Sequence, residues 1–206
     1  MATTGDLGHR ERKKLATRAA LSAAALQQAV EGGFEQLRVE EIAAAADVSP
    51  RTFNNYFASK EAAIVDLFAA RVERLRSELA ARPADEPLWD AIAAAATALV
   101  PAPAELPRWL ESARLIARTP SLEAEYLRAY ATLERILTAE IAARTGTDPD
   151  RDLFPRLAAN VAAGAIRAAF QYWVDTPATG PYGELLQRAV VEAGTGLHLP
   201  TTSEQG

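Results

Sequence analysis

Residues 39–60 are the most informative stretch of the chain and read Val39-Glu-Glu-Ile-Ala-Ala-Ala-Ala-Asp-Val-Ser-Pro-Arg-Thr-Phe-Asn-Asn-Tyr-Phe-Ala-Ser-Lys60. Its first part is apolar on one helical face, through Val39, Ile42, Ala43 and Ala46. Asp47 marks a turn, Ser49 is a good helix N-cap, and Pro50 suits the first helical position because its missing N–H would have no partner there. The stretch therefore predicts two short helices joined by a tight turn, followed by the cap of a third.

The second of these helices carries polar side chains that suit phosphates and base edges better than a core: Arg51, Thr52, Asn54, Asn55 and Tyr56. A helix-turn-helix places its second helix in the major groove of DNA. Phe53 and Phe57 are expected to anchor this helix in the core rather than to touch DNA. The pattern predicts a DNA-reading helix.

The run from Arg10 to Phe68 resembles the DNA-binding domain of TetR-type transcriptional regulators. The resemblance is carried by Ser49-Pro50-Arg51-Thr52-Phe53, by Tyr56-Phe57 and by Ala58-Ser59-Lys60-Glu61. The order of these motifs, with Ser-Pro-Arg-Thr-Phe followed by Asn-Tyr-Phe, is most similar to an actinobacterial branch of the family that includes mycofactocin-system regulators. Two positions depart from the family pattern. Asp47 replaces a usual Gly in the turn, although Asp tolerates left-handed backbone, and Asn54 replaces a usual aromatic residue.

The resemblance implies roles for individual side chains. Thr52, Tyr56 and Lys60 match family positions that grip the phosphate backbone, and Lys60 also starts a helix, where free N–H groups favour an anion. The base-edge candidates are Arg51, Asn54 and Asn55, since Asn can bond adenine bidentately in the major groove. The Ser49 hydroxyl suits either a cap or a phosphate contact.

Charge is distributed unevenly along the chain. The net charge is −5, but residues 1–60 carry eight Lys/Arg against seven Asp/Glu. The early cations are bunched, as Arg10, Arg12, Lys13, Lys14 and Arg18. A basic tip on an acidic body is what an oriented DNA binder needs, so Arg10 and Lys14 are expected to reach phosphates or the minor groove. A solvated helix start is the competing interpretation.

Composition excludes several classes of protein. The 206-residue chain has no Cys, so disulfides and thiol catalysis are excluded. His9 and His198 lie near opposite ends, and no phosphate-cradling glycine loop or paired metal-ligand motif occurs. We expect neither an enzyme nor a metal or cofactor site. The polar start is no signal peptide, and no apolar run suits a membrane span, so a soluble cytoplasmic protein is expected.

The whole chain is expected to be all-α, with about nine helices, because apolar residues recur at helical spacing between Pro and Gly breaks. The first helix is predicted from about Arg10 to Glu31, with one core face through Leu15, Ala19, Ala23, Leu26 and Val30. Ser59 is expected to cap a long helix through Arg82. The predicted organisation is a disordered tail over 1–9, a helix-turn-helix domain over 10–58, a helical regulatory and dimerisation domain over 59–199, and a disordered tail over 200–206.

The last two predicted helices are the candidates for self-association. TetR-like proteins pack the corresponding pair against its symmetry mate as a four-helix bundle, and a two-fold dimer demands a nearly palindromic operator. Intramolecular core packing is the competing interpretation. The candidate interface residues are Ala162, Ala165 and Ala169 in the first helix, and Leu185, Leu186, Ala189 and Val190 in the second.

The body beyond the DNA reader is expected to sense a small-molecule effector, which is what the family resemblance implies. Aromatic residues on separate helices and two arginines are the candidate lining, although ordinary packing or surface ion pairs would explain each of them. The candidates are Trp89, Trp109, Arg114, Arg118, Tyr126, Tyr130, Phe170 and Trp173. The resemblance suggests a fatty-acyl thioester such as an acyl-CoA, and repression is the family default, with activation left open.

Three other classes compete with an operator-specific regulator. Turnover of an acyl or nucleotide substrate would indicate an enzyme. Equal affinity for all DNA would indicate an architectural protein, against which the acidic body argues. Failure to bind any palindrome near its own gene would favour a helical lipid carrier with a vestigial helix-turn-helix.

Overall fold

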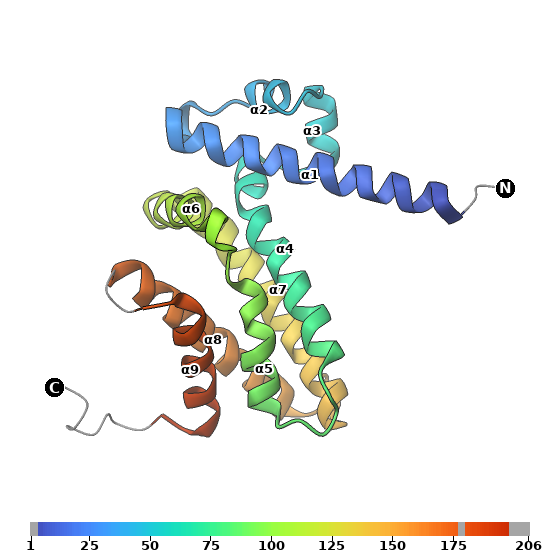
Figure 1. Cartoon of the computed structure of the whole chain (residues 1–206), viewed down its shortest axis with the longest axis vertical. Helices are drawn as coiled ribbons and strands as arrows, with labels where there is room; N and C mark the ends of the chain where they lie inside the picture. Colours follow the sequence, from blue (N-terminus) through green and yellow to red (C-terminus); the bar gives the residue numbers. More distant parts are fainter. Residues whose placement is uncertain (1–3, 177–179, 198–206) are drawn as a thin grey trace. The chain divides into compact units, whose positions relative to one another are not determined.

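The computed structural model describes residues 4–176 and 180–197, and within these ranges the chain forms nine α-helices and no strand (Figure 1). The all-α prediction is confirmed. The helices are α1 (Thr4–Gly32), α2 (Val39–Ala45), α3 (Pro50–Tyr56), α4 (Lys60–Ala81), α5 (Leu88–Ala96), α6 (Leu106–Arg118), α7 (Pro120–Thr145), α8 (Leu153–Asp175) and α9 (Tyr182–Thr195). Short 3-10 turns lie at Phe34–Gln36, Thr97–Leu99 and Pro103–Glu105. The disorder predicted for 1–3 and 200–206 lies outside the described residues.

The chain divides into two compact units, and their limits differ from the predicted domain boundary at 58/59. The first unit comprises the chain up to Ala70 together with Glu105–Ala129, and the second comprises Arg71–Ala104 and the chain from Tyr130 onward. Helices α4 and α7 each run from one unit into the other. The segment 105–129 belongs with the amino-terminal helices because its apolar side chains pack on their core.

The core of the first unit joins α1, α2, α3 and the first half of α4. Among its members Leu21, Ile42 and Phe53 are fully buried. Leu122, at the start of α7, is part of the same buried cluster, and Leu115 and Ile116 of α6 pack against it. This explains why a segment distant in sequence folds with the amino-terminal helices.

Helix α1 differs from its prediction in both length and face. It begins at Thr4 rather than Arg10, so residues 4–9, predicted to be disordered, are helical. Helix propagation adds one hydrogen bond per residue, and no proline stops it here. The buried face is Leu21, Ser22, Ala25, Leu26 and Ala29, so only Leu26 of the predicted face is buried. The helix ends as predicted at Gly32, after which Gly33 takes a φ of 85°.

The second unit is built around α5, α8 and α9. Helix α9 packs along both α8 and α5. The buried face of α8 consists mainly of small residues that let the neighbouring helix approach closely, together with Ile166. The small residues are Ala158, Ala159, Ala162, Ala163 and Ala169.

Candidate DNA-binding interface

Helix α3 is anchored by its two phenylalanines, as predicted. Phe53 is fully buried and Phe57 nearly so, with ring centroids 5.6 Å apart. Helical geometry then turns the intervening positions outward. Arg51, Asn54 and Asn55 are exposed, and the helix presents three hydrogen-bonding side chains to solvent.

The start of α3 has the predicted cap. The Ser49 hydroxyl accepts the Thr52 N–H at 3.1 Å, and the two side-chain hydroxyls lie 2.9 Å apart. Pro50 occupies the first helical turn. The Ser49 hydroxyl therefore serves as the cap, and its predicted phosphate contact stays a prediction. Thr52 and Tyr56 are half-buried, at the edge of the exposed face.

The turn between α2 and α3 tolerates its missing glycine in the way the sequence predicts. Asp47 has a φ of 54°, the left-handed region, and it is the one non-glycine residue with positive φ in the described part of the chain. The Val48 N–H donates to the Ala43 carbonyl at 2.9 Å and closes the end of α2. The turn thus keeps the tight geometry that a helix-turn-helix needs.

Lys60 faces inward, contrary to its expected role as a phosphate contact. Its Nζ donates to the carbonyl oxygens of Phe34 (2.9 Å) and Leu37 (3.1 Å), and it lies 4.4 Å from the centroid of the Phe34 ring. Two of its three N–H donors are therefore used to tie the loop after α1 to the start of α4. These two bonds give Lys60 a structural role and leave one N–H of the ammonium group for any phosphate.

The basic cluster on α1 separates into two groups. Arg10, Arg12, Lys13 and Lys14 are exposed, as a phosphate contact requires. Arg18 instead turns inward to α4, where its Nε donates to both carboxylate oxygens of Asp66 at 2.9 and 3.0 Å. The hydrogen bond to Asp66 raises the pKa of Arg18 above its ordinary value. Sequence reasoning missed this partner because Asp66 lies 48 residues away.

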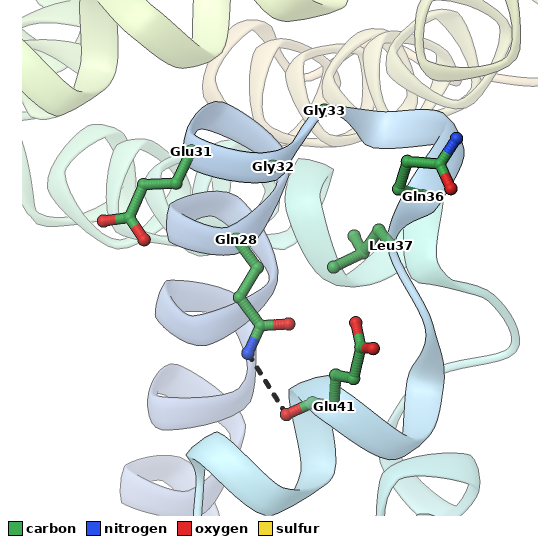
Figure 2. A pocket seen from close by; sticks show the side chains of 7 residues that line it. All are labelled: Gln28, Glu31, Gly32, Gly33, Gln36, Leu37 and Glu41. Carbon is green, nitrogen blue, oxygen red and sulfur yellow. Dashed lines mark hydrogen bonds between the residues drawn. The ribbon is translucent and has the colours of Figure 1, made fainter.

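A hollow of about 460 Å³ lies beside the end of α1, between that helix and the start of α2 (Figure 2). The Gln28 side chain forms part of the wall of this hollow, and its amide N–H donates to the Glu41 backbone carbonyl at 3.1 Å. Carboxylates and amides line it, and none of its lining residues is a cation: Gln28, Glu31, Gly32, Gly33, Gln36, Leu37 and Glu41. An acidic lining repels phosphate, and none of the predicted effector residues is in it.

Four of the predicted effector residues belong to the first unit. Arg114 and Arg118 are exposed on the outer side of α6. Trp109 is half-buried on the same helix, and Tyr126 packs on Phe68 with ring centroids 4.9 Å apart. The arginines therefore fit a solvated helix face, because nothing in their own unit encloses them.

The other four belong to the second unit, and two of them, Phe170 and Trp173, contact the same residue. Trp173 and Phe170 surround Tyr182, with centroid distances of 5.5 and 6.3 Å, and the Trp173 indole N–H donates to the Gly180 carbonyl at 3.0 Å. These three aromatic rings pack together where α8 ends and α9 begins. Trp89 lies against Gly194 of α9, and Tyr130 is buried with the Arg167 guanidinium 5.8 Å from its ring centroid.

The predicted dimer residues are mostly core residues of the protomer. Ala162, Ala169, Leu186 and Val190 are at most 3% exposed, and Leu185 is 8% exposed, because α8 and α9 pack on each other and on α5. Ala165 and Ala189 are half-buried. Sequence periodicity identified a real small-residue face, but the protomer itself covers most of it.

An exposed apolar stripe on the opposite face of α8 was missed. It runs the length of the helix and includes Leu153, Phe154, Leu157, Val161, Gly164, Ala168 and Tyr172. Leu153 is 74% and Leu157 55% exposed, whereas Val161 and Gly164 are half-buried. These positions recur at helical spacing, so they form one face. The sequence of α8 shows this 3.6-residue period. Because the helix has two apolar faces, however, the period alone does not predict which face is buried within the protomer.

A short polar helix, anchored by buried phenylalanines and presented by a tight turn, defines a helix-turn-helix DNA-binding protein. Residues 21–67 match the family described as bacterial regulatory proteins, tetR family, and residues 86–198 match the MftR C-terminal domain. The chain belongs to the TetR family of transcriptional regulators, and it is not an enzyme.

The relatives agree with this assignment. The chain is 36% identical to the HTH-type transcriptional regulator TcmR of Streptomyces glaucescens over 84% of its own length and 79% of the relative's. It is 28% identical to a putative mycofactocin biosynthesis transcriptional regulator, MftR, of Mycobacterium tuberculosis, over 79% and 82% of the two chains. The resemblance deduced from residues 49–61 is thus confirmed.

Solved structures share the fold. The fatty acid degradation regulator FadR of Bacillus halodurans matches with a TM-score of 0.59 at 21% identity, over 89% of this chain and 97% of that one. FadR of Bacillus subtilis, solved in complex with stearoyl-CoA, matches with a TM-score of 0.58 at 21% identity, over 87% and 98%. In the described part of this chain no helix is long and apolar enough to cross a membrane.

Proposed function

We propose that this regulator is an operator-specific repressor that binds nearly palindromic DNA as a homodimer and is released by a small apolar or acyl-type effector. The observation that carries the proposal is the face of α3, on which Arg51, Asn54 and Asn55 are exposed while Phe53 and Phe57 are buried. Such a regulator acts on the chromosome, so we place it in the cytoplasm.

The chemistry of this face suits base recognition. Asn can donate and accept at adenine, and Arg can donate twice to guanine, each pair contributing about 1–3 kcal/mol of discrimination. Thr52 and Tyr56 at the edge of the face, and Arg10 and Lys14 on α1, would hold phosphates. Phosphate contacts fix register, whereas the three side chains on α3 choose the sequence.

We propose that the dimer forms through the exposed stripe of α8 rather than through the residues that the protomer already covers. Gly164 lies on this stripe, and a Cβ built on it meets nothing within 4 Å. Together with Ala168 it leaves room for a second helix to approach closely. Leu153, Phe154 and Leu157 would supply apolar area at the interface, where burial is favourable by roughly 25 cal/mol per Å².

For the effector we propose a fatty-acyl thioester. The support is the match to the MftR C-terminal domain and the shared fold with a stearoyl-CoA complex. The effector must bind the DNA-free conformation more tightly, since a ligand moves an equilibrium only by its differential affinity. The aromatic residues of the second unit, Trp89, Tyr130, Phe170 and Trp173, remain proposed contacts.

Selection of DNA from a random-sequence pool by the purified protein tests the DNA-reading proposal. The selected sequence should be nearly palindromic and preferred over scrambled DNA by about 10³ or more. Asn54→Ala and Asn55→Ala should each relax the preference at one position per half-site. Gln187→Ala, which removes an exposed amide from α9, should change nothing. If the affinity for DNA depends steeply on salt and no DNA sequence is preferred, operator-specific regulation is refuted.

Release of the selected DNA by a series of acyl-CoA chain lengths, with free CoA and free fatty acid beside it, tests the effector. A long-chain acyl-CoA that releases DNA where CoA alone does not would support the proposal. Release by none of them would remove acyl thioesters from consideration. Transcription in vitro from a promoter that carries the selected sequence would then distinguish repression from activation.

A further inference from the structure

Arg18, one cation of the basic cluster, contacts other elements of the first unit, although 44% of its side chain is exposed. Arg18 lies on α1, and its guanidinium reaches two other elements at once. It forms a forked contact with Asp66 on α4, through Nε at 2.9 Å and Nη2 at 2.5 Å to the same Oδ1. It also lies 4.9 Å from the centroid of the Phe57 ring.

The carboxylate on the other side of this contact is well enclosed. Asp66 is 8% exposed, and its second oxygen accepts the hydroxyl of Ser22, which is fully buried on the next turn of α1. A buried carboxylate needs such partners, because an unpaired charge in a dry site is strongly unfavourable. Both ends of the pair are therefore fixed, and α1 is bound to α4 at one defined rotation.

Phe57 connects this pair to DNA reading. It is the C-cap residue directly after α3, and its N–H donates to the Phe53 carbonyl at 3.0 Å. Helix α3 has seven residues, too few to be stable alone. Its direction must come from what holds its ends. The cap holds one end, and the Phe57 ring, with the Arg18 guanidinium over it, holds the other.

We propose that Arg18 is a positioning residue for DNA recognition, which sets the orientation of α3 through Phe57 and Asp66 and contacts no phosphate itself. The inference rests on the proposed function, because it concerns how the DNA-reading face is aimed. It predicts that loss of Arg18 lowers operator preference without changing the number of phosphates neutralised.

The salt dependence of binding to the selected DNA distinguishes positioning from phosphate contact. Lys14→Met and Arg18→Met remove the same charge from the same helix. Lys14→Met should lower the slope of log affinity against log salt by about one per protomer, which is about two for the proposed homodimer, whereas Arg18→Met should leave that slope unchanged. Arg18→Met should still weaken operator binding by about ten- to a hundredfold, the discrimination of one well-aimed base contact. A slope that falls in Arg18→Met by as much as in Lys14→Met would overturn the proposal.

Arg18→Met alone leaves the Asp66 carboxylate unpaired, so the double variant Arg18→Met/Asp66→Leu removes both charges and keeps the fold. It should weaken operator binding to a similar degree. Amide hydrogen exchange of the free double variant should also be faster by about tenfold at residues 54–57 than in the parent chain, with α2 unchanged. Parental operator binding together with parental exchange would refute the inference.

The exchange measurement needs no operator. If the parent chain prefers no DNA sequence, the proposed function fails, while the exchange at 54–57 still decides whether Arg18 orients α3.

Discussion

A glycine near the end of α9 decides how closely that helix approaches α5. A Cβ at Gly194 would lie 2.1 Å from two ring atoms of Trp89, closer than any real contact. The indole therefore lies on the helix backbone itself. At Gly164 on α8 an added Cβ meets nothing within 4 Å, so two helical glycines of one unit have opposite surroundings.

Gly194→Ala should destabilise the protein by about 1–3 kcal/mol, because the methyl group forces the Trp89 ring out of its place. Gly164→Ala is the matched control. It should be neutral or stabilising by up to about 1 kcal/mol, the gain in helix propensity. Chemical denaturation of both variants checks this, and equal effects would contradict the packing described.

Single residues also show how far sequence reasoning reached. The positive φ of Asp47, the Ser49 cap and the burial of Phe53 and Phe57 all followed from local chemistry. The inward turn of Lys60 and Arg18 did not, because their partners lie 23 to 48 residues away in the chain. The sequence position of a Lys or Arg does not show which hydrogen-bond acceptor its side chain contacts in the folded protein.

At the scale of elements, α7 supports the loop between α4 and α5. Arg144 donates to the carbonyls of Arg82, Pro83 and Glu86, and its guanidinium lies 3.8 Å from the Glu86 carboxylate. Arg82 also hydrogen-bonds Glu86. This hydrogen bond, with the charges of Arg82 and Arg144, holds the pKa of Glu86 below its ordinary value near 4.5.

Because the pKa of Glu86 is lower in the folded protein, its ion pairs stabilise the fold above about pH 4.5, and this contribution is lost as pH falls through the folded value. Glu86→Gln should therefore lower Tm at pH 7, and the difference from the parent chain should shrink below pH 4.5. Thermal unfolding across this range checks it. Glu192→Gln, in an exposed pair with Arg188, should change Tm little. A pH-independent effect of Glu86→Gln would contradict the electrostatic origin.

The turn from α6 into α7 forms part of the core of the DNA-reading unit. Leu122→Ala, at a fully buried position, should destabilise that unit by about 2–5 kcal/mol through the cavity it leaves. Leu127→Ala on the same helix is the control. Its side chain is 48% exposed, and its loss should cost about 0.5 kcal/mol or less. Urea unfolding followed at the α3 amides distinguishes the two, and similar losses would show that the segment is not part of that core.

At the scale of the whole molecule, the apolar stripe of α8 predicts assembly. Gly164→Arg places a large charged side chain in space that is open within the protomer, so the fold should survive. The proposed interface should not, because an unpaired charge would be buried between two helices. Sedimentation should show a dimer for the parent chain and a monomer for the variant, with unchanged helical circular dichroism. A variant that stays dimeric would place the interface elsewhere.

Local sequence patterns predicted most of the helices and their breaks, the helix-turn-helix and the family, because propensity, capping and turn chemistry act over a few residues. It predicted the separation of polar and apolar sides on α3 for the same reason. Only the tertiary structure decided which apolar face of α8 is covered, where α6 and the start of α7 pack, and which cations of the first unit are free for DNA. Those outcomes depend on contacts between distant segments, and periodicity along one helix carries no information about its partner.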